Sequence, residues 1–480
     1  MPPLQRPERP ETIALPPRRG TVAARPDVVV VGGGPAGIGA AVGAARTGAD
    51  VLLVERYGFL GGNATVALVM PLMSWHNEIR GARARGADEP LRLLPEDHGP
   101  GEPVVGGVLL ELMERLLQRG GAIAPSEDTG YTVPIDPEAY KGAALDLLDA
   151  VGVRYLLHSF ASGVLGKAGR PEGVVLETKA GPLAVPAGAI VDASGDGDVA
   201  AAAGAAYEIG RDDGLVQPMT LMFRVVDYEH ERFEGYVRDH PDQWRGVMGL
   251  WDLIEEARAA GELDLPREDI LFFATPRPRE LTFNSTRVGG VLGIDVFDLT
   301  RAERLARTQM EQIVRFLRKR VPGFEQAYAV QSGTQIGVRE TRRITGEYVL
   351  NADDVLRSRQ FDDVVARGSY PIDIHDPKGG RGTLLERLPA GGAYDIPLRC
   401  LIPRDVDRLL VAGRCISGTH EAHSSYRVTP IAMATGHAAG VTAALAARDG
   451  IPPRAVVAGD VQRVLVEQGA NLGEAARVRS

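Results

Sequence analysis

Residues 27–55 read DVVVVGGGPAGIGAAVGAARTGADVLLVE and contain the most specific motif in the chain. The run Val28–Val31 is β-branched, which is typical of a short strand buried on both faces. A GxGxxG pattern formed by Gly32, Gly34 and Gly37 follows it. In such a pattern the first glycine permits a tight turn, the second lets the backbone approach a pyrophosphate, and the third lets a helix pack on the strand.

An alanine-rich helix is predicted to begin near Pro35 and Ala36 and to run to about Arg46. Its first N–H groups and the positive end of its dipole favour a bound phosphate. The next predicted strand, Val51–Val54, ends in Glu55, whose carboxylate suits hydrogen bonds from ribose hydroxyls. Glycine-rich turns are common in a chain with 58 glycines, but strand, turn, helix, strand and acid occur here in the order that a dinucleotide site requires.

The residues after this unit favour FAD over NAD. An NAD enzyme usually continues with regular βαβ units, whereas Arg56 here begins the loop RYGFLGGNAT. Its adjacent glycines, Gly61 and Gly62, would let the backbone lie against a large flat ring.

Two later segments also suit FAD. AIVDA (189–193) is a predicted buried strand that runs into Ser-Gly-Asp-Gly-Asp, and LLVA (409–412) runs into Gly413-Arg414. A glycine- and alanine-rich helix predicted over about 429–447 offers a second N-terminus to a phosphate or a flavin carbonyl.

Together these segments resemble the glutathione-reductase-like flavoprotein superfamily, and more closely its functionally mixed family of FAD-dependent oxidoreductases, distant relatives of the fumarate reductase flavoproteins. The matching pieces, between residues 27 and 448, are GGGPAGIGAA, ERYGFLGGNAT, VDASGDGDVA, IGVRETRRITGEYVL, DIPLRCLIP and VAGRCISGTHEAHSSYRVTPIAMATGHAAG. The resemblance implies a non-covalently bound FAD. The implied FAD-binding residues are Gly32, Gly34, Pro35, Ala36, Gly37, Glu55, Arg56, Gly61, Gly62, Asn63, Ala64, Ala193, Gly195, Gly413, Arg414 and Gly436.

One position departs from the superfamily pattern. Many members have Gly-Asp or Gly-Glu beside the ribityl chain, whereas this chain has Gly413-Arg414. The usual acidic contact is therefore in doubt, and Arg414 becomes a candidate partner for a phosphate or for the flavin C2 carbonyl.

The resemblance implies an α/β fold in which a Rossmann-like, glutathione-reductase-like FAD-binding domain carries an inserted α+β substrate or cap domain. We expect a flexible segment at 1–25, a discontinuous FAD-binding domain at 26–219 and 396–480, and the cap at 220–395. Within the cap, TLMFRVV (220–226) and ELTFNST (280–286) are predicted antiparallel strands, and helices are predicted at 251–260 and 300–320. The charged, Gly- and Pro-rich residues 78–101 are predicted to be a mobile excursion.

Composition limits the classes of function. The 480 residues are 44% hydrophobic and 24% charged with a net charge of −9, which argues against disorder and against a surface that binds nucleic acid. No uncharged apolar run of about 18 residues is present, so no membrane span is expected. Cys400 and Cys415 fit neither a disulfide framework nor a CxxC motif, and Arg18-Arg19 precedes no apolar signal core; we expect a cytoplasmic protein.

Missing motifs narrow the chemistry. We find no convincing second GxGxxG for NAD(P)H, no CxxxxC pair for dithiol exchange and no GWxWxIP segment of flavin-dependent halogenases. The organic substrate itself is then the expected reductant, and dioxygen, a quinone or a protein carrier the expected electron acceptor.

Arginines surround an acid in VRETRRI. Arg339, Arg342 and Arg343 beside Glu340 suit the bidentate capture of a substrate carboxylate or the stabilisation of an anionic reduced flavin. A structural ion-pair network joining the two domains is the open alternative.

Histidines supply the candidate proton acceptors. His420 and His423 precede Arg427 in a loop that the resemblance places beside the flavin, and a histidine titrates near neutrality. Their spacing is not the HExxH of a metal site, so no metal is predicted. His76, beside Trp75, is a further candidate at the ring, and ordinary structural roles for all three histidines stay open. Covalent attachment of flavin to Cys415 is not expected.

The leading hypothesis is an FAD-dependent oxidoreductase that dehydrogenates a small polar or anionic metabolite, with arginines orienting it and His423 or His420 accepting a proton. One alternative is a flavin monooxygenase or reductase acting on a biosynthetic intermediate. The other is a flavin-carrying RNA-modification or scaffold protein, against which the acidic charge weighs. A homo-oligomer stays open.

Overall fold

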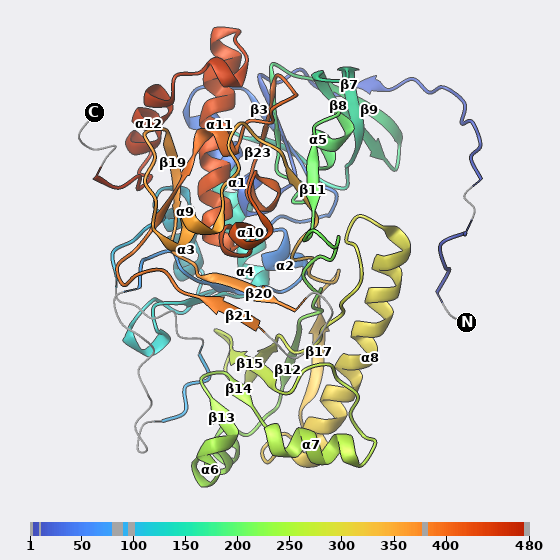
Figure 1. Ribbon diagram of the computed structural model, residues 1–480, viewed down its shortest axis with the longest axis vertical. Coiled ribbons are helices and arrows are strands. Elements are labelled where there is room, and N and C mark those ends of the chain that lie inside the picture. The colour runs from blue at the N-terminus through green and yellow to red at the C-terminus, as the bar shows by residue number, and fades with distance from the viewer. Residues whose placement is uncertain (1–2, 9–10, 79–89, 95–100, 377–382, 475–480) are drawn as a thin grey trace.

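A five-stranded parallel sheet carries the glycine turn (Figure 1). The structure is a computed structural model and describes residues 3–8, 11–78, 90–94, 101–376 and 383–474. The sheet has the order β23-β10-β2-β3-β6, and every neighbouring pair is parallel. Its strands are β2 (Val28–Val31), β3 (Val51–Val54), β6 (Arg154–Leu156), β10 (Ala189–Asp192) and β23 (Leu409–Val411). All residues of β2, β3, β10 and β23 are buried, which confirms the prediction of strands covered on both faces.

Two long-separated helices, α1 (Pro35–Arg46) and α11 (Thr429–Asp449), pack directly against each other. Glycine makes this approach possible: a Cβ on Gly436 would lie 1.9 Å from the Ala36 carbonyl oxygen. In the described part of the chain, α11 is the one helix that is long and apolar enough to cross a membrane. However, 89% of its most apolar window is buried inside the protein, as in the core helix of a globular fold.

Further elements surround this centre. A four-stranded sheet with the order β1-β9-β8-β7 contacts the parallel sheet through β8 and β10. Its strands are β1 (Thr21–Val22), β7 (Phe160–Lys167), β8 (Arg170–Thr178) and β9 (Gly181–Pro186). The remaining elements here are α2 (Asn63–Val66), β4 (Pro71–Leu72), α3 (Val108–Gln118), β5 (Val133–Pro134), α4 (Pro137–Ala150), α5 (Asp198–Ala202) and α12 (Ala458–Glu467). Because β1 pairs with β9, part of the N-terminal segment predicted to be flexible forms a strand.

A six-stranded antiparallel sheet forms the other end of the molecule (Figure 1). Its order is β13-β14-β15-β16-β12-β17, and Phe223, Phe272 and Phe283 lie in its hydrophobic cluster. The elements are β12 (Phe223–Val226), α6 (His230–Asp239), β13 (Trp244–Arg245), β14 (Met248–Gly249), α7 (Trp251–Ala259), β15 (Ile270–Ala274), β16 (Glu280–Phe283), α8 (Val296–Arg320) and β17 (Tyr328–Ser332). The predicted helices correspond to α7 and α8, and the predicted strands pair antiparallel as β12 and β16.

After β17 the chain returns to the parallel-sheet end. There β18 (Arg342–Ile344) pairs with β11 (Tyr207–Ile209). The other elements are α9 (Ala352–Leu356), β19 (Val364–Gly368), β20 (Ile372–His375), β21 (Thr383–Glu386), β22 (Tyr394–Pro397) and α10 (His420–Tyr426). The stretch 336–341 therefore links the two ends of the molecule.

The predicted excursion at 78–101 is only partly described, because 79–89 and 95–100 lie outside the described residues. Within it, Leu91 and Leu93 are buried in the hydrophobic cluster of the antiparallel sheet, so the prediction of unpacked chain is wrong for these two residues. Their apolar side chains gain more by packing against the sheet than by remaining in water.

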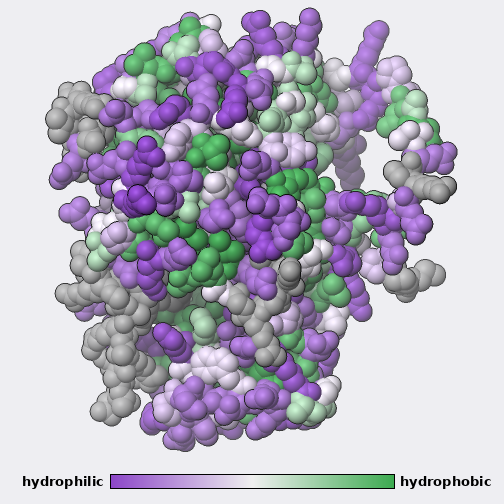
Figure 2. All heavy atoms as spheres, viewed as in Figure 1, coloured by the Kyte–Doolittle hydropathy of each residue, from purple (hydrophilic) through white to green (hydrophobic). Residues whose placement is uncertain are grey.

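On the face shown in Figure 2, hydrophilic side chains dominate both ends, and hydrophobic side chains gather nearer the middle.

Candidate active site

The glycine turn has the geometry that its sequence predicts. Gly32 has a φ of +101°, and a Cβ there would lie 2.4 Å from the Ala193 carbonyl oxygen. A Cβ on Gly37 would lie 1.7 Å from the Gly32 carbonyl oxygen, so α1 packs tightly on the turn. Helix α1 begins after Gly34 with Pro35 in its first turn, and no described side chain caps it. Its first N–H groups are therefore suited to a phosphate.

An open cleft lies at the carboxyl ends of β2 and β3. It is lined by Val31, Gly32, Val54, Glu55, Arg56, Ser159, Phe160, Ala161, Ser194 and Asp198. Glu55 accepts hydrogen bonds from the backbone N–H groups of Gly33 at 2.6 Å and Tyr57 at 2.9 Å. Burial raises the pKa of its carboxyl group, while these two bonds oppose the rise. Because each carboxylate oxygen accepts more than one hydrogen bond, Glu55 keeps capacity for a ribose hydroxyl.

The predicted ring-side loop lies directly on the glycine turn. The N–H of Gly61 donates to the Gly33 carbonyl oxygen at 2.8 Å, and a Cβ on Gly62 would lie 2.8 Å from the Gly34 Cα. Asn63 donates to the Val338 carbonyl oxygen at 3.2 Å, and the buried Ala64 follows it in α2. The cleft, the uncapped helix and this backbone-to-backbone contact together fit an extended dinucleotide such as FAD.

The departure at Gly413-Arg414 has a structural counterpart. Arg414 forms an ion pair with Asp196 at 2.7 Å and donates to the Thr341 hydroxyl at 3.0 Å. Burial alone would raise the pKa of Asp196, but the charge and hydrogen bond of Arg414 hold it below its usual value. Asp196 follows Gly195, whose Cβ would lie 3.0 Å from the Arg414 guanidinium. An acid is thus present beside Arg414, but it comes from the turn after β10, and sequence reasoning did not single it out.

Glu340 organises the second predicted group. This fully buried carboxylate accepts from Arg343 at 2.5 Å and from the backbone N–H of Gln217 at 3.0 Å. Nδ1 of His420 lies 2.9 Å from the same carboxylate. The other ring nitrogen of His420, Nε2, is buried and has no hydrogen-bond partner among the described residues. Glu340 therefore fixes the ring and leaves Nε2 able to accept a proton.

His423 has a different environment. It is fully buried, and neither ring nitrogen has a partner among the described residues. Burial and the positive charges of Arg343 and Arg427 lower its pKa well below the usual value. A neutral ring results, but it is a poor proton acceptor because its cationic form is strongly disfavoured.

Two of the predicted arginines differ in their partners: Arg342 forms an ion pair, whereas Arg339 donates to neutral oxygens. Arg342 pairs with Asp198 at 2.9 Å and donates to the Asp196 carbonyl oxygen. Arg339 instead donates to the Pro218 carbonyl oxygen at 2.5 Å and to the Thr220 hydroxyl at 2.7 Å.

The last predicted arginine, Arg427, ends α10. Its guanidinium lies 3.6 Å from Asp373, an acid that sequence reasoning missed because its sequence context carries no motif.

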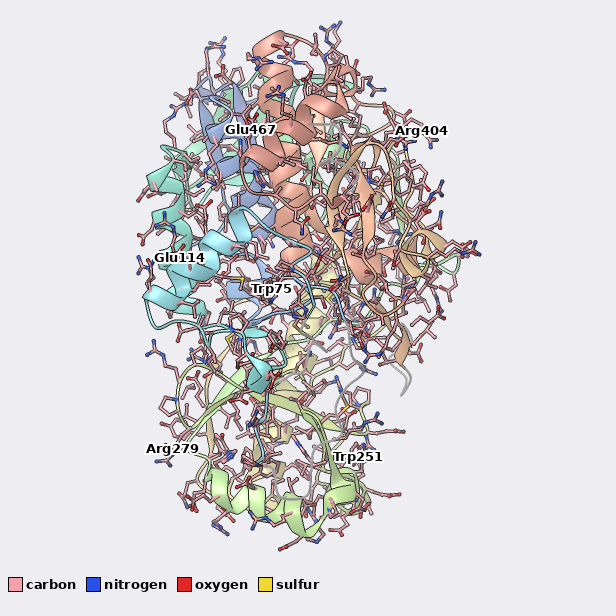
Figure 3. All side chains as sticks on the ribbon, turned by 90° about the vertical axis from the view of Figure 1, so that its left-hand side faces the viewer. Trp75, Glu114, Trp251, Arg279, Arg404 and Glu467 are labelled. Atoms are coloured by element: carbon pink, nitrogen blue, oxygen red, sulfur yellow. The ribbon has the colours of Figure 1, made fainter. Side chains whose placement is uncertain are left out.

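His76 and Cys415 occupy packed positions. The His76 ring has edge contacts with Trp75 and Tyr131, at centroid distances of 5.2 and 5.7 Å. In Figure 3, Trp75 lies between Glu114, which is in helix α3, and the antiparallel sheet near Arg279. Cys415 is buried, and burial raises the pKa of its thiol well above the usual value, which makes covalent attachment unfavourable.

Comparison with known proteins adds the following. A family model described as FAD dependent oxidoreductase matches residues 27–465. No curated protein sequence matches the chain.

Among solved structures, the chain is similar to a geranylgeranyl bacteriochlorophyll reductase-like protein from Thermoplasma acidophilum, with 13% identity, a TM-score of 0.44 and coverage of 95% of this chain and 87% of that one. It is also similar to p-nitrophenol 4-monooxygenase PnpA from Pseudomonas putida, with 10% identity, a TM-score of 0.43 and coverage of 93% and 84%. The flavin-dependent brominase Bmp2 is 14% identical to the chain, with a TM-score of 0.43 and coverage of 90% of this chain and 81% of that one.

Proposed function

The chain belongs to the FAD-dependent oxidoreductase family, and on that premise we propose that it dehydrogenates a small polar or anionic metabolite by hydride transfer to FAD. The protein is thus an enzyme, and its cofactor is FAD. When bound, FAD supplies the two-electron acceptor for the substrate. The finer assignments are part of the proposal: a glutathione-reductase-like FAD half, and a substrate-covering role for the antiparallel sheet.

The FAD-binding part of the proposal follows the geometry of the two glycine loops. The N-terminus of α1 would hold the pyrophosphate, and Glu55 would accept from the ribose hydroxyls. The loop from Gly61 to Ala64 would support the ring, and Asp196 with Arg414 would lie beside the chain that joins ring and phosphate.

The observation that carries the reaction is the His420–Glu340 pair. Dehydrogenation of an alcohol or amine removes a proton as the hydride leaves, so a proton acceptor must lie at the reacting atom. His420 offers Nε2 for this role because Glu340 holds the opposite ring nitrogen. Glu340 in turn neighbours Thr341, which contacts Asp196 and Arg414 in the proposed FAD site. In this assignment His420 accepts the proton and Glu340 is a positioning residue.

Anaerobic titration of the FAD-loaded protein with a metabolite panel, followed by flavin absorbance, tests the proposal. We expect His420→Gln to slow flavin reduction by about 10²–10⁴-fold, because a general base is lost. His423→Gln is the matched variant and should stay within about tenfold of the wild type, since a base with so low a pKa contributes little. FAD content is measured first, so that loss of cofactor is separated from loss of chemistry.

Three outcomes would overturn the assignment. Equal effects of the two histidine substitutions would remove His420 from its role. Rapid flavin reduction by NADPH would favour a reductase, and incorporation of labelled oxygen from dioxygen into the product would favour a monooxygenase. Reoxidation by dioxygen, a quinone or a protein carrier would identify the electron acceptor.

A further inference from the structure

Four arginines from distant parts of the sequence lie close enough to interact, because the charges of Arg267, Arg287 and Arg427 all act on Arg339. Arg267 precedes β15, Arg287 follows β16, Arg339 precedes β18 and Arg427 ends α10. Arg267 and Arg287 are 8% and 6% exposed, so these charges are largely removed from water. Buried guanidinium groups are unfavourable unless anions or hydrogen-bond acceptors compensate them.

A single backbone segment brings two of these arginines together. Met219 forms an antiparallel bridge with Val288, and Thr220 forms one with Gly337. Arg287 and Arg339 therefore flank the segment 218–220, to which Arg339 also donates its two hydrogen bonds.

The other two arginines, Arg267 and Arg427, differ in how closely a carboxylate pairs with them. Arg267 is compensated locally, because Asp269 accepts from it at 2.7 and 3.0 Å. Arg427 meets Asp373 at 3.6 Å, but Asp373 is shared with His375 at 3.6 Å and with the Tyr370 hydroxyl at 3.0 Å. The buried Nε of Arg427 has no hydrogen-bond partner among the described residues.

Like charges surround Arg339. The positive charges of Arg427, Arg287 and Arg267 act on it, together with the negative charge of Asp373. Burial and the charge of Arg427 lower the pKa of Arg339 to about 9, and burial and Arg267 lower that of Arg287 to about 10. A bound anion would relieve the repulsion between these arginines at Arg339.

This cluster also lies close to the proposed flavin site. Asn63 of the ring-side loop donates to the carbonyl oxygen of Val338, the residue before Arg339. Arg427 stands two positions before Thr429, where α11 begins. We infer that Arg287, Arg339 and Arg427, hereafter the arginine cluster, bind an oxyanion of the substrate, so that the metabolite is a carboxylate or a phosphate ester. The inference rests on the proposed function, because it names the substrate class of the same site.

The test uses the FAD-loaded protein and needs no known substrate. Inorganic phosphate, malonate and acetate are titrated separately at constant ionic strength, with chloride as the control salt, while flavin absorbance and thermal stability are followed. We expect saturable changes with phosphate or with the carboxylates, and the more effective class identifies the oxyanion. Arg287→Gln and Arg427→Gln should weaken this binding at least tenfold, as expected when a charge-assisted hydrogen bond is lost. Arg279→Gln is the control: this residue lies in the turn between β15 and β16, its side chain is 64% exposed, and the variant should bind as the wild type does.

Failure of this inference can be told from failure of the proposed function. No saturable response, or equal binding by all variants, would overturn the arginine cluster as an anion site. Arg287→Lys, which keeps the charge, should retain more binding than Arg287→Gln and so separates misfolding from loss of recognition. If neutral metabolites reduce the flavin and anions do not compete, the inference fails while the proposed function stands. If anions bind but no metabolite reduces the flavin, the proposed function fails while the anion site stands.

Discussion

Arg339 and Arg343 lie four residues apart in one stretch of sequence, yet they have opposite electrostatic surroundings. Arg343 is buried against Glu340 and also donates to the carbonyl oxygens of Gly418 and Gly210. Arg339 donates to neutral oxygens, and no carboxylate among the described residues forms an ion pair with it. Residue type alone thus does not distinguish an arginine that holds the fold from one that can recognise an anion. The presence or absence of a paired carboxylate does.

The largest expected effect is on stability, when Arg343 loses its paired carboxylate. Glu340→Gln should lower the free energy of unfolding by about 3 kcal/mol, because it leaves the buried Arg343 charge without its acid. Denaturant unfolding of the FAD-loaded protein measures this. An unchanged denaturant midpoint would show that Arg343 is solvated or paired in another way. The contrast between Arg343 and Arg339 would then be wrong.

For Arg339, which has no paired carboxylate among the described residues, we expect a large effect on substrate binding and a small effect on stability. Arg339→Gln is expected to raise the KM for the substrate about 10–100-fold, which corresponds to the loss of a charged hydrogen bond. Its free energy of unfolding should change by less than about 1 kcal/mol, since removing a buried charge without a paired carboxylate offsets the loss of its two hydrogen bonds to neutral oxygens. Steady-state kinetics with the best substrate of the panel provides the measurement, and Arg304→Gln on the exposed side of α8 is the control. Strong destabilisation with an unchanged KM would assign Arg339 to the structural class.

A third test concerns Asp198, the acid paired with Arg342. Burial and the charges of Asp196 and Asp192 raise the pKa of Asp198 to about 6. The native state therefore holds this proton more tightly than the unfolded chain does, and the stability from this group is lost as pH rises from about 4 to 6. Unfolding across that window should show a decline that Asp198→Asn removes, on the order of 1 kcal/mol after allowance for solvent screening. An identical slope in the variant would contradict the raised pKa.

The smallest effect is expected at Glu208, the second acid near Arg343. It lies 3.4 Å from the guanidinium, but its side chain is 68% exposed. Glu208→Gln should change the free energy of unfolding by less than about 1 kcal/mol, because water screens an exposed pair. The same denaturant series used for Glu340→Gln measures it, and a loss as large as that of Glu340→Gln would show that burial does not decide the strength of these pairs.

The sequence predicts the parallel sheet well because its signals are local. Val28–Val31 and Val51–Val54 are short apolar runs bounded by turn residues, and the structure confirms both strands. The same locality explains a failure: the charged surroundings of Leu91 and Leu93 hide that these two side chains pack on a distant sheet.

The candidate site is predicted less completely because its contacts are non-local. The sequence points to His420, Glu340, Arg343 and Arg339, but not to Arg287 or Asp373. Arg287 and Asp373 carry no motif, and they reach the site only through the pairing of 218–220 with two other segments and through the packing of β20 on α10. A charge count along the chain does not reveal which arginines have acids, since Asp196 and Arg414 form an ion pair although they are 218 positions apart.

The contact between α1 and α11 has a consequence for the order of folding. Helix α1 is synthesised long before the glycines that fit it, Gly436 and Gly440. Closing so long a loop is slow, and the partner face of α1 stays uncovered meanwhile. The nucleotide-binding turn therefore acquires its final support only after α11 has been synthesised, so a chain that stops before α11 would keep the motif in its sequence but not its packed fold.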